Sequence, residues 1–202
     1  MGLFLEAAKC WNSLQNTSYC ITFGKNKKLK NINLIFRDVD FDHLSGIHYA
    51  DDVDFKLHRN EYRGDKLIPA LLSQKLDDGL IEKSSNWGKI SDRLSAVTNI
   101  CDVLESNFTL YYFSPNRLTF HSTITAVYFL YSEQFSNGIF LFLDKEENCF
   151  YCKSVFSKDV RDYCINQTRL KVLKKTKMVC GEEKTLFVHP NFKETENVIL
   201  TV

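Results

Sequence analysis

The segment "FDHLSGIHYADD", residues 41–52, places two histidines, a serine and a glycine within an acidic stretch. Histidine titrates near neutral pH, so it can act as a general acid or base. His43 follows an aspartate-rich helix start, and Ser45 and Gly46 come within three residues of it, where glycine allows a ligand to approach the backbone. A histidine packed at a helix start explains the same residues. Both interpretations stay open on this segment alone.

The other groups with chemical potential give weaker patterns. Cys149 and Cys152 have a CxxC spacing, but no second cysteine pair follows at zinc-finger distance. On a strand their sulfurs would face opposite sides, which favours structural thiols. The aspartates of residues 38–54 lack the glycine and the terminal glutamate of a calcium loop. We therefore predict no metal site and no cofactor.

A basic strand is predicted at "TRLKVLKKTK", residues 168–177. On a period of two, Arg169, Lys171, Lys175 and Lys177 point to one face, and apolar residues point to the other. Such a face suits binding of RNA phosphates. Lysines that protect a sheet edge from pairing give the same pattern. The spacing does not choose between the two interpretations.

Composition limits the class of protein. The chain has 202 residues, 44% hydrophobic content and only 8 Gly and 3 Pro, which predicts one packed domain. A net charge of +1 gives no overall attraction to nucleic acid or to an anionic membrane. Every apolar run is far shorter than the roughly 18 residues of a membrane span. With seven cysteines and no leader pattern in "MGLFLEAAKCW", we expect a cytoplasmic protein that does not bind membranes.

Hydrophobic periodicity predicts helices first and strands later. The expected helices lie at 3–15, from about 65, at 89–105 and around 157–164. The expected strands lie at 18–23, 31–37, 108–113, 117–121, 125–132, 138–144, 148–156, 168–177 and 184–189. We therefore predict a single α+β domain over 1–202, with a helix-rich part with one hairpin at 1–106 and a strand-rich part at 107–202. Its amino-terminal helices and the hairpin would pack on a mainly antiparallel sheet.

The order of these motifs resembles a family of phage and mobile-element nucleases. Its specific parts are a strand ending in Phe, a short spacer, an "FxHLTG" motif and a later "DIR" segment. The matching residues are Phe41, His43, Leu44, Ser45 and Gly46 for the first motif, and Asp159, Val160 and Arg161 for the second. Serine replaces the usual threonine and keeps the hydroxyl. The chain thus resembles the fourth phage subgroup of the barnase, EndoU, colicin and RelE-like nucleases over most of its length.

The resemblance implies RNA cleavage without a metal, which leaves a 2′,3′-cyclic phosphate and a 5′-hydroxyl. This chemistry needs a base, an acid and cations that stabilise the charged transition state. The resemblance makes His43 the acid or base, Arg161 the phosphate clamp and Ser45 a group that orients the substrate or His43. His121, in "LTFHSTIT", is a candidate second acid or base, although no family motif matches it.

Structural explanations compete with these roles. His43 would equally anchor the turn between strand and helix, and Arg161 would form a salt bridge with Asp159 or Asp162. The function therefore has two main candidates, and a metal-binding structural protein built around the cysteines is a third, weaker one. The first is an RNase that acts as a toxin or effector of a mobile element. The second is a catalytically inactive module that binds RNA or a host protein, such as a phage-encoded inhibitor of a host defence. The expected partners are RNA and either an antitoxin or a host protein.

Overall fold

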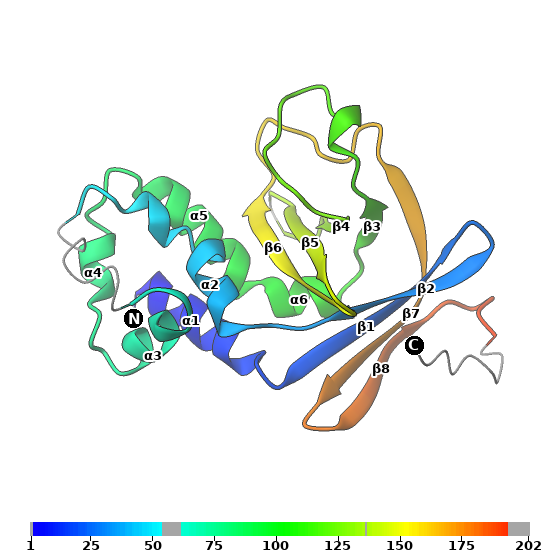
Figure 1. The fold of residues 1–202 in the computed structure, drawn as a ribbon, viewed down its shortest axis with the longest axis horizontal. Coiled ribbons are helices and arrows are strands. Elements are labelled where there is room, and N and C mark those ends of the chain that lie inside the picture. The colour runs from blue at the N-terminus through cyan, green and yellow to red at the C-terminus, as the bar shows by residue number, and fades with distance from the viewer. Residues whose placement is uncertain (1, 54–61, 136, 194–202) are drawn as a thin grey trace.

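The computed structural model describes residues 2–53, 62–135 and 137–193. Its centre is a β-barrel with helices at one end (Figure 1). The strands are β1 Thr17–Lys25, β2 Lys28–Leu34, β3 Thr109–Tyr112, β4 Tyr128–Ser132, β5 Ile139–Glu146, β6 Cys149–Ser157, β7 Thr168–Val179 and β8 Glu182–Val188. The helices are α1 Leu3–Ser13, α2 Asp38–Leu44, α3 Leu67–Leu72, α4 Asp78–Ile81, α5 Trp87–Thr98 and α6 Ile100–Glu105. Short 3₁₀ turns form η1 Ile47–Tyr49, η3 Gly64–Lys66 and η4 Pro115–Arg117.

The sheet closes on itself, so the prediction of helices packed on a mainly antiparallel α+β sheet is wrong. The strand order is β1-β2-β6-β5-β4-β3-β7, and β7 pairs back onto β1 from Thr17↔Val179 to Gly24↔Lys171. These seven strands form a barrel, and β8 extends from it as an extra strand on β7. The β2–β6 pair is parallel, so the barrel is mixed. Alternating side chains indicate two faces but do not reveal whether the two sheet edges meet.

The predictions of individual helices and strands were more accurate than the prediction of how they are arranged. The first helix, the first hairpin and the β7–β8 pair are confirmed. The helix predicted at 89–105 is divided into α5 and α6 at Asn99. The Asn99 side chain donates a hydrogen bond to the carbonyl of Ser95, and such a bond competes with the backbone hydrogen bonds of a continuous helix. The strand predicted at 117–121 and the helix predicted at 157–164 do not form. Both segments are irregular and cover the outside of the barrel.

The two faces of the strands carry two separate cores. Leu110, Leu130 and Leu141 are successive cross-strand partners that point into the barrel and are fully buried there. The adjacent residues Phe129 and Phe142 point outward, because side chains alternate along a strand. They are nevertheless buried in a second cluster with Phe113, Phe140 and Tyr163. The irregular segments thus have an aromatic core of their own outside the barrel.

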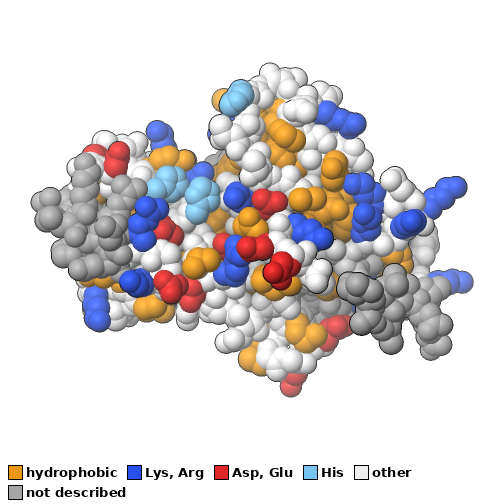
Figure 2. All heavy atoms as spheres, in the orientation of Figure 1, with side chains coloured by type: hydrophobic (Ala, Val, Ile, Leu, Met, Phe, Trp, Pro, Cys, Tyr) orange, Lys and Arg blue, Asp and Glu red, His pale blue; other side chains and the backbone are white. Residues whose placement is uncertain are grey.

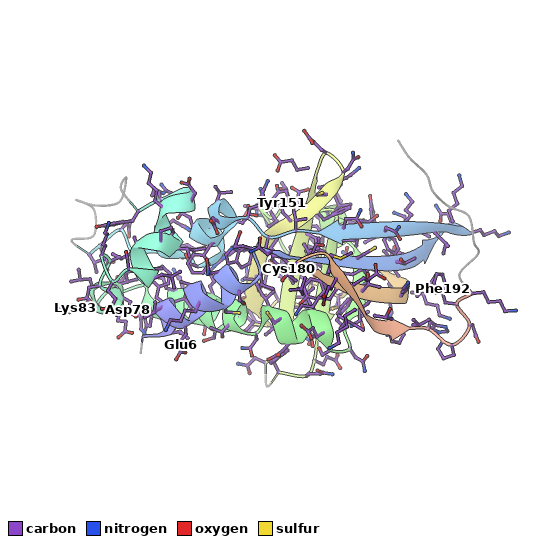
Figure 3. The ribbon with its side chains drawn as sticks, turned by 90° about the horizontal axis from the view of Figure 1, so that it is seen from below. Glu6, Asp78, Lys83, Tyr151, Cys180 and Phe192 are labelled. Atoms are coloured by element: carbon purple, nitrogen blue, oxygen red, sulfur yellow. The ribbon has the colours of Figure 1, made fainter. Side chains whose placement is uncertain are left out.

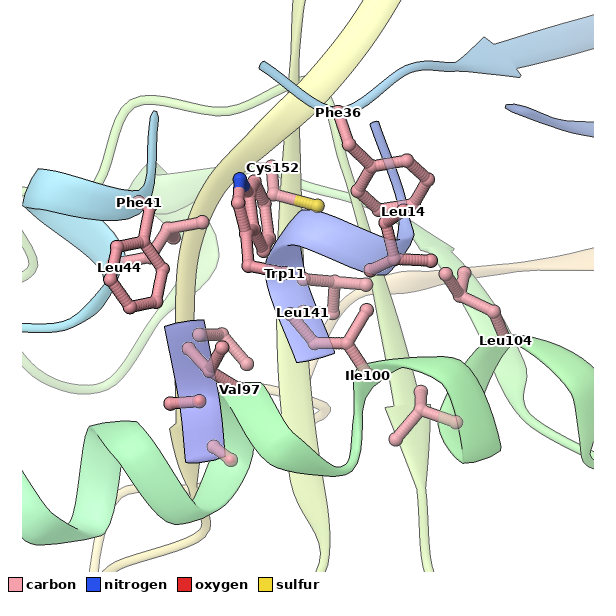
Figure 4. Packing of buried hydrophobic residues seen from close by; sticks show 14 of the residues in the cluster. Trp11, Leu14, Phe36, Phe41, Leu44, Val97, Ile100, Leu104, Leu141 and Cys152 are labelled. Carbon is pink, nitrogen blue, oxygen red and sulfur yellow. The ribbon is translucent and has the colours of Figure 1, made fainter. Parts of the chain in front are cut away.

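The helices attach to the barrel along β6, which α2 and α5 both contact. Seen from below, the helical part and the barrel lie end to end in an elongated molecule (Figure 3). Trp11 of α1 is central to this junction: it is fully buried, and Figure 4 shows it close to Phe36 and Leu14. Its indole N–H donates to the carbonyl of Arg37 at 3.0 Å. This bond fixes the chain just before α2, which carries the histidine motif.

We expect Trp11→Ala to lower the free energy of unfolding by about 3–5 kcal/mol, the usual cost of truncating a buried tryptophan. The indole ring packs edge-on against Phe36 at 5.5 Å, so the substitution removes aromatic contacts as well as a hydrogen bond. Urea titration followed by circular dichroism measures the change. Asn12→Ala, an exposed neighbour on the same helix, is the control and should change stability by less than about 0.5 kcal/mol. Equal losses in the two variants would contradict the role of Trp11.

Candidate active site

A cleft of about 630 Å³ lies between the helical part and the segments that cover the barrel. Its helical wall consists of Tyr49 from η1 with Lys89, Asp92 and Arg93 from α5. Its opposite wall includes His121 and Arg161 from the two irregular segments. Figure 2 shows histidine side chains on both the helical part and the upper lobe of this face. The cleft therefore brings together two of the predicted catalytic residues, His121 and Arg161.

Tyr163 positions both of these residues. It is 1% exposed and packs edge-on against Phe120 at 4.9 Å between ring centres. Phe120 precedes His121, and Tyr163 follows Arg161 by two residues, so one buried ring anchors both segments at the cleft. The aromatic core outside the barrel thus supplies the rigidity that these loops lack by themselves.

Arg161 lines the cleft and also forms an ion pair with Asp159. Its Nε and Nη2 donate to Asp159 Oδ2 at 2.9 and 2.5 Å, and its backbone N–H donates to Asp159 Oδ1. This hydrogen bonding keeps the pKa of Asp159 below its ordinary value. The sequence suggested two roles for Arg161, a salt bridge and a cleft cation. The structure is compatible with both, because Arg161 is paired with Asp159 and also lines the cleft.

His43 lies beside the cleft and does not line it. It lies at the end of α2, where its ring is partly covered, and the ring lies parallel to that of His48 with centres 5.3 Å apart. The ring of His48 in turn contacts that of Tyr49, a cleft residue, at 4.1 Å. His43, His48 and Tyr49 thus form a row of rings that leads to the cleft.

Comparison with known proteins identifies the family. A model of the family described as phage-Barnase-EndoU-ColicinE5/D-RelE like nuclease4 matches residues 3–188. The chain belongs to this nuclease family. The resemblance inferred from the two short motifs is therefore confirmed, and the family name implies a nucleic acid substrate. No curated protein and no solved structure matches the chain.

The charge state of the histidine pair in this nuclease-family protein is set by burial and by neighbouring cations. Burial, followed by the charges of Arg93 and Lys153, lowers the pKa of His43. Burial, followed by His43 and Arg93, lowers the pKa of His48 to about 4. The Asp42 carboxylate opposes both shifts. Both imidazoles are therefore neutral at pH 7, and a neutral imidazole can accept a proton.

Ser45 holds the turn of the nuclease-family motif together. It is fully buried, and its hydroxyl donates to the carbonyl of Asp42 at 3.0 Å and accepts from the N–H of Ile47 at 3.4 Å. These bonds join the end of α2 to η1. The serine therefore fixes the relative position of His43 and His48 through the backbone.

The acidic residues around the motif act as structural acceptors. Asp42 Oδ2 accepts from the N–H of Gly64 at 2.9 Å, and Asp40 forms a salt bridge with Arg37. Asp52 accepts from Ser84 and Ser85. No group of three His, Cys, Asp or Glu residues that could hold a metal occurs in the part of the chain that the structure describes. Asp54, one of the aspartates considered above, lies outside that part.

Arg93 is a cleft residue that the motif analysis missed. Its Nη1 is buried and has no hydrogen-bond partner among the described residues, which is rare for a guanidinium nitrogen. Gly46 makes room for it: a Cβ at Gly46 would lie 2.8 Å from Arg93 Cδ, and the glycine has a φ of +74°. One sequence pattern could have indicated Arg93: Lys89 and Arg93 are four residues apart, so they share one face of a helix and place two cations together.

The basic strand lies apart from the cleft. Arg169, Lys171 and Lys175 line a second pocket of about 440 Å³ that shares no residue with the cleft. Lys175 is 5% exposed, and its Nζ donates to the carbonyls of Leu104 and Ser106. Burial lowers the pKa of this amine to about 8. Lys177 pairs with Glu105 at 2.7 Å. Lys175 and Lys177 therefore both stabilise the end of α6.

No helix in the described ranges is long and apolar enough to cross a membrane.

We expect Gly46→Ala to lower the free energy of unfolding by more than Gly64→Ala does. Both glycines have positive φ, where an alanine costs roughly 1–2 kcal/mol. A Cβ at Gly46 also meets Arg93, whereas a Cβ at Gly64 has no atom within 4 Å. Urea titration of the two variants separates backbone strain from the Arg93 contact. Equal losses would show that Arg93 does not depend on Gly46 for space.

We expect stability to fall as the pH is lowered from about 6.5 toward 4. Unfolded His48 titrates near its ordinary pKa of about 6.5, whereas folded His48 has a pKa of about 4. Between these values the unfolded state binds more protons, so acid favours unfolding. Urea titrations at pH 7 and pH 5 should show a smaller difference for His48→Gln than for the wild type. His121→Gln, an exposed histidine outside the row of rings, is the control and should keep the wild-type difference.

Proposed function

We propose that the chain is an endoribonuclease that cleaves RNA in this cleft without a metal ion. The products would carry a 2′,3′-cyclic phosphate and a 5′-hydroxyl. The observation that supports this proposal best is the convergence of His121, Arg161 and Arg93 on one cleft in a chain of a nuclease family. These are the residue types that the reaction needs for proton transfer and for stabilising a charged phosphate.

In this mechanism, His43 and His121 are the acid–base pair. One takes the proton from the 2′-hydroxyl, and the other protonates the leaving 5′-oxygen. His43 suits the role of base, because its lowered pKa leaves the imidazole neutral at pH 7. His121 is exposed on a wall of the cleft and is the other member of the pair. Ser45 orients His43 by fixing the turn that follows it.

The cations of the cleft stabilise the transition state of this reaction. Arg93 brings a buried guanidinium nitrogen that gains a hydrogen-bond acceptor when a phosphate enters. Arg161 is the clamp on the opposite wall, and Asp159 orients it in the absence of substrate. Lys89 adds a third positive charge beside Arg93. Opposing cations in a confined cleft favour the extra negative charge that develops during the reaction.

Cleavage of labelled single-stranded RNA in the presence of EDTA tests the proposal. We expect the wild type to cut the RNA, and His121→Ala, His43→Ala and Arg161→Ala each to lower the rate by about 100-fold or more. Arg93→Ala should have an effect of similar size. Lys83→Ala removes an exposed cation from the far end of the helical part and is the matched control (Figure 3). Mass spectrometry of the products identifies the cyclic phosphate.

Two outcomes would contradict the proposal. Loss of cleavage in EDTA, with recovery on addition of a divalent cation, would overturn the metal-independent mechanism. Absence of cleavage under all conditions, with RNA binding intact, would favour the catalytically inactive module. Full activity of the histidine and arginine variants would overturn the site assignment alone. The roles as a toxin and as the target of an antitoxin or host protein stay predictions.

A further inference from the structure

A second groove lies on the outside of the barrel along β3, β4 and β7. Two hollows of about 440 and 620 Å³ share Asn107, Phe108, Thr109 and Arg169, so they form one continuous groove. None of its lining residues lines the catalytic cleft. The groove follows a gap beside β7, which pairs with β3 over 168–170 and with β8 only from Lys174 onward.

Two tyrosines form one wall of this groove. Tyr111 stacks on Phe129 with ring centres 4.7 Å apart, and Tyr131 stacks on Phe140 at the same distance. Phe129 and Phe140 are fully buried, whereas both tyrosines are partly exposed. The aromatic core therefore supports one face of each tyrosine ring, and Lys158 Nζ lies 5.6 Å from the ring centre of Tyr131. Fixed, partly exposed rings are suitable platforms for stacking of an unpaired base.

The cations of the groove lie directly beside these rings. Arg169 is the cross-strand partner of Tyr111, and Lys171 follows it on the same side of β7. Both side chains are exposed, and neither forms a hydrogen bond or ion pair with the described residues. Lys175 also lines the groove, but its buried Nζ is bound to the carbonyls of Leu104 and Ser106, and Glu133 is the only acidic residue in the lining. The groove is therefore cationic in a protein whose net charge is +1.

The groove and the cleft lie on either side of one chain segment. Arg161 and Tyr163 of residues 158–167 line the cleft, whereas Cys164 of the same segment packs against the same outer aromatic cluster as Tyr111, which lines the groove. A ligand that passes over this segment can contact both.

We propose that this groove is a second binding subsite for single-stranded RNA, which holds the strand whose scissile phosphate lies in the cleft. An unpaired base stacks on Tyr131 or Tyr111, and the adjoining phosphates bind Arg169 and Lys171. The subsite rests on the proposed ribonuclease function for the identity of its ligand. A duplex does not fit this role, because its bases are stacked on each other and do not present their faces to the tyrosines.

Binding of a non-cleavable RNA tests the subsite independently of catalysis. The probe is a fluorescent 2′-O-methyl RNA of about 12 nucleotides, within the range of roughly 4–16 that a single-strand-binding module covers. Methylation removes the attacking hydroxyl, so the wild-type protein can be used. Fluorescence anisotropy should give a Kd about tenfold higher for Arg169→Glu. Tyr131→Leu, which keeps most of the side-chain volume, should raise the Kd about fivefold, the lower end of the effect of one stacked base.

Lys83→Glu is the matched control, because it makes the same change of charge at an exposed position on the helical part. It should change the Kd by less than about twofold. The subsite is overturned if Arg169→Glu and Lys83→Glu weaken binding equally, if Tyr131→Leu and Tyr111→Leu both bind as the wild type does, or if a duplex of the same sequence binds as tightly as the single strand. Failure of the proposed ribonuclease would be seen in the cleavage assay instead, so the two results are separable.

Discussion

The pairing of β1 with β7 is the interaction on which the rest of the structure depends. It joins residues 17–24 to residues 171–179, and so connects the two ends of the chain across most of its length. Closure removes both free edges of the seven strands and gives the barrel an interior filled by apolar side chains. A contact between such distant segments costs more loop entropy than a local hairpin, so it depends on many cooperating partners. The strand register that follows from it decides which residues face outward.

The outward-facing aromatic residues of the barrel position the loops of the candidate site. In most barrels the outer face meets solvent or helices, but here two irregular segments fold over it and bury Phe129, Phe140 and Phe142. Tyr163 connects the two segments through this cluster, and His121 and Arg161 extend from them toward the helices. The loops are thus positioned by burial of large apolar rings, which contributes far more free energy than their few hydrogen bonds.

The electrostatics of the cleft follow from its position between two parts of the molecule. Cations come from both walls, and the carboxylates of Asp40, Asp42 and Asp159 form ion pairs or accept hydrogen bonds from the backbone. The same cations and partial burial keep the histidine pair neutral. A near-neutral chain can therefore hold a site suited to phosphate, because local charge and burial determine the potential within a cleft.

The sequence by itself determined the family, most of the strands and helices, and the chemical types of the candidate residues, because these depend on short motifs and on local periodicity. It also made Ser45 a candidate for orienting the substrate or His43. Only the tertiary structure decided that the sheet closes, that His121 and Arg161 meet in a cleft, that Arg93 joins them, and that Lys175 is buried beside α6. Each of these depends on contacts between segments far apart in the chain, and residue spacing along the sequence carries no information about such contacts.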